Sequence, residues 1–167
     1  VGGTYVNVSL ASESKINPFD LPRATTSDAS VEDIIRSAVI TVKGLLKIMI
    51  GIPQGKAGVL GFTPEEDAIL DRAILEAYAK QDITPDADLS KVTPPTMKDL
   101  QDTLEGMTGG EQLVERIRKY TEGTFAGLFN SPPTVETKNQ LVVFSVRDLE
   151  DELRPMAIYN IISYIWN

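Results

Sequence analysis

The strongest constraint on the fold is an apolar run near the end of the sequence, Gln140–Arg147, followed by a second one, Asp148–Trp166. The first is rich in β-branched and aromatic residues, a pattern typical of a strand covered on both faces in a parallel sheet. The second places apolar residues around most of a helix, so we expect that helix to be buried. Only Thr4–Ser9 also favours a strand. The chain therefore predicts two edges of an α/β sheet separated by a long helical segment.

Composition narrows the possible functions. The 167 residues, 42% of them apolar, suffice for one domain with a substantial core. A net charge of −8, without a basic cluster, disfavours direct nucleic-acid binding. The sequence contains neither cysteine nor histidine, which excludes disulfides, thiol nucleophiles, Ser–His relays and the usual zinc sites.

Neither the start of the sequence nor its most apolar window indicates secretion or membrane insertion. The sequence opens without a signal-peptide pattern. It begins with Val1 and lacks an initiator methionine, so we expect an excised fragment or a processed product. The window Ser37–Ile52 carries Lys43 and Lys47. It is also shorter than the roughly 20 residues that a membrane-spanning helix needs. We therefore expect a buried helix and no transmembrane span.

Helix signals fill the middle of the chain. Ser30 is placed to cap a long apolar helix, and Thr63–Glu66 is a capping box with proline at the first helical position. Thr96 caps a shorter helix, and another follows Gly110. The predicted helices are 31–50, 63–81, 96–106 and 110–120, with the apolar stretch 123–130 lying across them.

Two patterns suggest chemistry but do not meet its requirements. Gly51–Ala57 contains a Gly-Lys pair, yet a phosphate loop needs four residues between its glycines, a Ser or Thr after the lysine and a preceding strand. We interpret it as a glycine linker that ends a helix. The carboxylates at 65, 66, 67 and 71 are typical of a solvated helix face, so no metal site is predicted. A hydrolase that uses paired carboxylates is also disfavoured, because no spacing singles out a pair.

The order of the parts resembles a known family. A strand after Gly-Gly, the connector Asn17–Leu21, a helical block and the strand Leu141–Leu149 leading to Trp166 together resemble the type IV secretion and conjugative-transfer ATPases. In that family a RecA-like motor core carries a helical subdomain between its two nucleotide-binding motifs. The resemblance implies a mainly α chain with a minor β part, a helical subdomain bracketed by strands of a RecA-like P-loop α/β sheet. The implied boundaries are 1–27 for the strand and connector of the core, 28–135 for the all-helical insert, and 136–167 for the return strand and helix.

The resemblance also implies a function for the parent protein. That protein would bind ATP with magnesium, assemble as a homo-hexamer and drive pilus biogenesis and transfer of DNA or protein. It would work in the cytoplasm, at the inner face of the bacterial membrane. The insert would contact neighbouring subunits or secretion-channel components. A free-standing helical interaction module without motor activity is the alternative.

The chain departs from the family pattern in its catalytic parts. By family order the phosphate loop would precede Val1 and the acidic strand would follow Asn167, while Ser145 stands where an acidic residue is expected. We therefore expect no catalytic residue, no bound cofactor and no ATP hydrolysis by this chain alone.

A candidate binding edge can still be placed. Ligands of open parallel sheets bind beyond the carboxyl ends of the strands, where Ser145, Arg147 and Asp148 lie. Arg147 at this edge could contact nucleotide or a neighbouring subunit. The alternative is that Arg147 and Arg154 pair with the acidic residues at 148, 150, 151 and 152.

Overall fold

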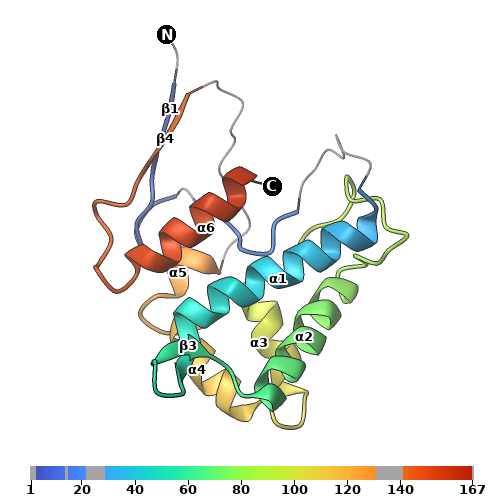
Figure 1. Ribbon diagram of the computed structural model, residues 1–167. Coiled ribbons are helices and arrows are strands. Elements are labelled where there is room, and N and C mark those ends of the chain that lie inside the picture. The colour runs from blue at the N-terminus through green and yellow to red at the C-terminus, as the bar shows by residue number, and fades with distance from the viewer. Residues whose placement is uncertain (1–2, 14, 22–28, 131–140, 167) are drawn as a thin grey trace.

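The computed structural model describes residues 3–13, 15–21, 29–130 and 141–166, and its helices form a block beside a short pair of strands (Figure 1). Most of the described secondary structure is helical, which confirms the prediction of a mainly α chain with a minor β part. The elements in order are β1 (Thr4–Asn7), α1 (Val31–Ile50), β2 (Ile52–Gln54), β3 (Val59–Gly61), α2 (Pro64–Ala79), α3 (Met97–Glu105), α4 (Glu111–Thr121), α5 (Ala126–Phe129), β4 (Val142–Ser145) and α6 (Arg154–Trp166). Gln140 and Asn167 lie outside the described residues, and so do the residues at the implied boundaries 27/28 and 135/136.

β1 and β4 are parallel neighbours, although they come from opposite ends of the chain (Figure 1). Their register runs from Thr4 opposite Val142 to Asn7 opposite Ser145. The two strands predicted from opposite ends of the sequence therefore form one sheet. Their direct pairing was not predicted, because a sequence pattern identifies strands but does not indicate which strands pair.

The strand pair is covered on one face only, which corrects the expected burial of both faces. Val6 is buried, and the Phe144 ring lies 6.5 Å from the Tyr164 ring of α6. On the other face Tyr5 is 68% exposed and Val143 is 46% exposed. Alternate residues of a strand point to opposite faces, and no described element covers the second face.

α1 is the central helix. Its N-cap Ser30 accepts a hydrogen bond from the Asp33 backbone N–H at 3.1 Å, as the sequence predicts. One side of α1 is buried and contacts α2, α4 and α6. The predicted capping residues Thr63 and Thr96 are confirmed at the starts of α2 and α3.

The predicted glycine linker at Gly51–Ala57 is wrong in part. α1 does end at Ile50, with the Gly51 N–H bonded to the Lys47 carbonyl at 3.1 Å. The residues that follow form an antiparallel hairpin, β2–β3, rather than a linker. Gly55 and Gly58 adopt φ of 59° and 64°, so these glycines supply the left-handed conformations of its turn.

The connector 16–21 is fixed to the helical block. The Asn17 side chain donates to the Pro95 carbonyl at 2.8 Å and accepts from the Phe19 N–H at 3.1 Å. Phe19 is fully buried against Tyr78, and Leu21 is also buried. The connector thus joins β1 to the core of α1–α4; Pro22 lies outside the described residues.

α6 buries only part of its surface, although the sequence predicts a helix buried over most of its circumference. Met156, Ala157, Asn160 and Ile161 are buried. Its other side leaves four large apolar side chains exposed, namely Ile158, Ile162, Ile165 and Trp166. No helix of the described residues combines the length and the apolar character that a membrane span would need.

Candidate functional site

The carboxyl ends of β1 and β4 bring two of the three predicted site residues together. Asn7 lies opposite Ser145, and the Val8 N–H donates to the Ser145 carbonyl at 2.8 Å. The Asn7 side-chain amide donates to the Asp148 carboxylate at 3.1 Å. Ser145, Asp148 and Asn7 therefore form one cluster at this edge.

Asn7 is the member of the cluster that the sequence analysis missed. Its side-chain Oδ1 is buried and has no hydrogen-bond partner among the described residues. Its backbone carbonyl accepts from the Ser12 hydroxyl at 2.5 Å. In the sequence, Asn7 is marked only by its position at the end of the first strand. That position matches the position of Ser145 only if the two strands pair in parallel.

Arg147 is exposed beside this cluster, and no described carboxylate forms an ion pair with it. The Arg147 carbonyl instead accepts from the Arg154 guanidinium at 3.5 Å. Arg154 also donates to the Leu149 carbonyl at 3.1 Å and pairs with Asp151 at 2.5 Å. The turn before α6 is thus held by Arg154. A role of Ser145, Arg147 and Asp148 in binding stays a prediction.

This edge offers one carboxylate, one hydroxyl, one amide and one guanidinium. No group of three or more acidic residues suited to a metal ion is present in the described part of the chain. Such a set can bind polar groups of a ligand or of a neighbouring chain.

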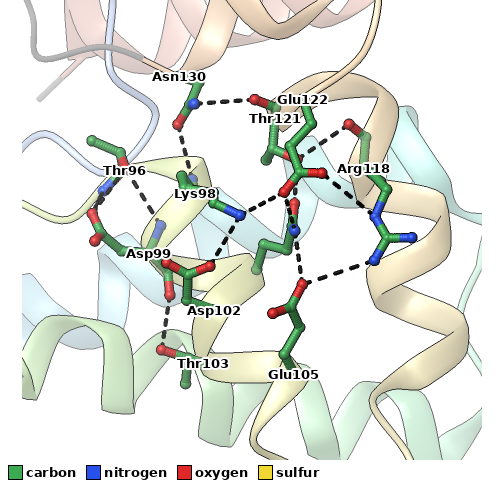
Figure 2. Close-up of polar contacts among 11 residues, drawn as sticks. Thr96, Lys98, Asp99, Asp102, Thr103, Glu105, Arg118, Thr121, Glu122 and Asn130 are labelled. Atoms are coloured by element: carbon green, nitrogen blue, oxygen red, sulfur yellow. Dashed lines mark hydrogen bonds and ion pairs between the residues drawn. The ribbon is translucent and has the colours of Figure 1, made fainter.

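A second polar cluster joins α3 to α4 (Figure 2). Lys98 contacts Glu122 at 2.6 Å and Asp102 at 3.1 Å, and Gln101 donates to both Glu105 and Glu122 at 2.9 Å. The hydrogen bond from Lys98, with a second one from Gln101, lowers the pKa of Glu122. The same contacts with Glu122 and Asp102 raise the pKa of Lys98.

The remaining members of the cluster extend it to α5. The buried Thr121 hydroxyl donates to the Gln101 side chain, and the Asn130 side chain accepts from the Lys98 N–H at 2.9 Å. Arg118 lies 3.7 Å from Glu122. Two cations, Lys98 and Arg118, contact three carboxylates, so the cluster joins α3 to α4 through polar contacts and keeps an excess of negative charge.

Polar contacts also fix α6 and the turn before it to the helical block and the connector. The Tyr159 hydroxyl of α6 donates to the Thr41 carbonyl of α1 at 3.2 Å, and the Asn160 side chain donates to the Ile16 carbonyl at 2.9 Å. Lys119 of α4 pairs with Glu152 at 2.8 Å. The candidate edge and the helical block are therefore parts of one packed structure.

Comparison with known proteins supports the fold. No protein-family model matches the chain, and no curated protein matches its sequence. Among solved structures, VirB4 of Thermoanaerobacter pseudethanolicus is similar to it, with a TM-score of 0.78 and 23% sequence identity. This chain has the VirB4 fold. The similarity covers 99% of this chain and 62% of the VirB4 chain, so this chain spans less than two thirds of that structure.

VirB4 is a type IV secretion ATPase, so the predicted resemblance to that family is confirmed at the level of the fold. The likeness also agrees with the predicted mainly α architecture. At this level of identity it carries no residue-level function to Ser145, Arg147 or Asp148.

Proposed function

We propose that this chain is a segment of a type IV secretion ATPase, in which β1, β4 and α6 belong to a RecA-like nucleotide-binding sheet and the helical block is an insert. The boundaries of the segment are 1–27, 28–135 and 136–167. The parent hydrolyses ATP with magnesium to drive pilus biogenesis and the transfer of DNA or protein. Its subunits form a homo-hexamer in the cytoplasm, at the inner face of the bacterial membrane, and the insert contacts neighbouring subunits or secretion-channel components.

The observation that carries the proposal is the strand pair. β1 and β4 are parallel, and residues as far apart as Asn7 and Asp148, 141 positions, meet at their carboxyl ends. Parallel sheets are normally covered on both faces, whereas Tyr5 and Val143 leave one face of this pair apolar and open. A sheet of only two strands is also too small to be stable on its own. Both facts favour further strands and helices in the complete protein.

The test uses the complete polypeptide that contains this segment. We expect it to hydrolyse ATP in the presence of magnesium, and we expect Val143→Asp to abolish most of that activity and to lower its unfolding temperature. Burying an unpaired carboxylate costs several kcal/mol. Ile40→Asp, at an exposed position of α1, is the matched control and should change neither quantity much.

Two results would overturn the proposal. Hydrolysis of ATP by the 167 residues alone would show that they contain the catalytic parts. A complete polypeptide that tolerates Val143→Asp as well as Ile40→Asp, and that does not hydrolyse ATP, would favour the free-standing helical interaction module.

A further inference from the structure

The β2–β3 hairpin is an exposed apolar element that the proposed motor function does not use. Its two strands leave Val59 67%, Leu60 44% and Ile52 40% exposed. In the register Pro53 opposite Leu60 and Gln54 opposite Val59, Ile52 and Val59 share one face. Pro53 and Leu60 lie on the other. Apolar side chains on both faces of a projecting hairpin are characteristic of an interaction surface.

The turn of the hairpin stands clear of the rest of the molecule. A Cβ added to Gly55 or Gly58 would meet no atom within 4 Å. The proline in β2 removes one backbone donor, which makes β2 a poor edge for pairing with a further strand. The hairpin therefore presents side chains rather than backbone groups.

The root of the hairpin is held firmly by buried contacts. Arg116 of α4 donates to the Ile50 carbonyl at 2.9 Å and forms an ion pair with the nearly buried Glu66. The Tyr120 hydroxyl, fully buried, donates to the Met49 carbonyl at 3.0 Å. The last turn of α1 and the start of the hairpin are thus fixed in advance. Preorganisation of this kind lowers the entropic cost of binding.

The stretch of sequence that contains the hairpin has the opposite charge to the whole chain. The sequence from Ile34 to Pro64 contains no acidic residue, whereas the whole chain has a net charge of −8. Arg36 and Lys43 of this stretch are paired with carboxylates. Lys47, at the root, and Lys56, in the turn, are exposed and form no ion pair within the described part of the chain. The hairpin is thus an apolar surface flanked by two unpaired cations.

We propose that the hairpin, defined as residues 51–61, together with Lys47, docks into an apolar groove with a carboxylate rim on a different protein chain. The two lysines pair with the rim while Ile52, Val59 and Leu60 enter the groove. Two cations are too few for a nucleic-acid site, and the net charge of −8 opposes attraction to an anionic membrane. This inference rests on the proposed function, which assigns partner contacts to the helical block, and it names the surface that makes one of these contacts.

The test is site-specific photo-crosslinking of the complete protein in the cells that produce it, with benzoylphenylalanine at position 59. We expect one crosslinked protein whose attached peptide, identified by mass spectrometry, contains apolar residues next to Asp or Glu. The same probe at Leu75, an exposed apolar position on α2, is the control and should not give this product. Lys47→Glu combined with Lys56→Glu should lower the yield about tenfold, whereas the corresponding arginine variants retain it.

The outcomes separate this proposal from its rivals and from the proposed function. A yield at position 59 no higher than at 75, a product that is lipid, nucleic acid or a second copy of this chain, or a yield unaffected by charge reversal would each overturn the docking site. ATP hydrolysis is measured on the same complete variants and should be unchanged. If the complete protein gives the expected crosslink but does not hydrolyse ATP, the docking site is supported and the proposed motor function is refuted.

Discussion

Tyr159 of α6 lies directly over Gly44 of α1, where the helix backbone leaves just enough room for the phenol. A Cβ added to Gly44 would lie 1.9 Å from the Tyr159 hydroxyl oxygen and 2.8 Å from its ring carbon. The hydroxyl donates to the Thr41 carbonyl one turn earlier in α1. This contact explains a glycine in the middle of a long helix, where it costs about 1 kcal/mol relative to alanine.

Gly44→Ala is therefore expected to destabilise the protein by about 1–3 kcal/mol, because overpacking outweighs the gain in helix propensity. Tyr159→Ala should remove most of the additional cost of Gly44→Ala, so the two substitutions are not additive. Chemical unfolding of the parent, the two single variants and the double variant measures the effect. Ser37→Ala, at an exposed position of the same helix, is the control. A Gly44→Ala variant as stable as the parent would contradict the close approach.

Arg116 is expected to contribute far more to stability than an exposed arginine. Removing its side chain in Arg116→Ala leaves the nearly buried Glu66 carboxylate without its ion-pair partner and the Ile50 carbonyl without the Arg116 donor, at a cost of about 2–4 kcal/mol. Arg36→Ala removes an exposed pair within one helix and should cost less than about 1 kcal/mol. Urea unfolding of both variants measures this difference. Equal losses would show that the root of the hairpin is not fixed by Arg116.

The helices could be predicted from the sequence because their signals are local. Ser30, Thr63 and Thr96 each cap a helix through a backbone N–H three residues away, and that geometry depends on no distant segment. The hairpin was missed because glycines mark both helix ends and tight turns. Only the pairing of 52–54 with 59–61 distinguishes the two.

The candidate site depended on a contact between distant parts of the chain. Ser145 and Asp148 were found because they follow a strong strand pattern. Asn7 was not, because its role arises from the parallel pairing of β1 with β4. The exposure of Tyr5, Val143 and Trp166 could not be predicted either. An apolar pattern indicates that a side chain favours burial, but it does not indicate whether these 167 residues supply the surface that buries it.

Tyr78 should make stability fall at alkaline pH. Its side chain is fully buried, and burial, with a smaller effect of Asp20, raises the pKa of its phenol. The folded chain holds this proton more tightly than the unfolded chain, in which the pKa is near 10. The stabilisation is therefore complete below about pH 10 and is lost as the pH rises further.

Tyr78→Phe tests this dependence. The variant loses the hydrogen bond to the Phe19 carbonyl, 3.1 Å in the parent, and should be about 1–2 kcal/mol less stable at neutral pH. Its free energy of unfolding should fall less steeply than that of the parent between about pH 9 and pH 11. Tyr5→Phe, at an exposed position, should leave the neutral-pH stability unchanged. Parallel curves for Tyr78→Phe and the parent would contradict the assignment.

Asn17→Asp should destabilise the protein in a manner that depends on pH. In the parent, the buried amide of Asn17 donates to the Pro95 carbonyl at 2.8 Å, while its oxygen accepts from the Phe19 N–H. An aspartate keeps the second contact but directs a charged oxygen at the Pro95 carbonyl, at a cost of about 2–4 kcal/mol.

The penalty should shrink in acid. Burial and the facing carbonyl raise the pKa of the introduced carboxyl in the folded state, so stability is regained as the pH falls and the carboxyl becomes able to donate to Pro95. Unfolding temperatures measured at about pH 7 and about pH 4.5, relative to the parent at each pH, check this expectation. Asn17→Ala removes the same hydrogen bonds without adding a titratable group, so its penalty should be the same at both pH values. If the two variants respond alike to pH, the introduced carboxyl does not face the Pro95 carbonyl, and the connector is not fixed to the helical block in the way the structure describes.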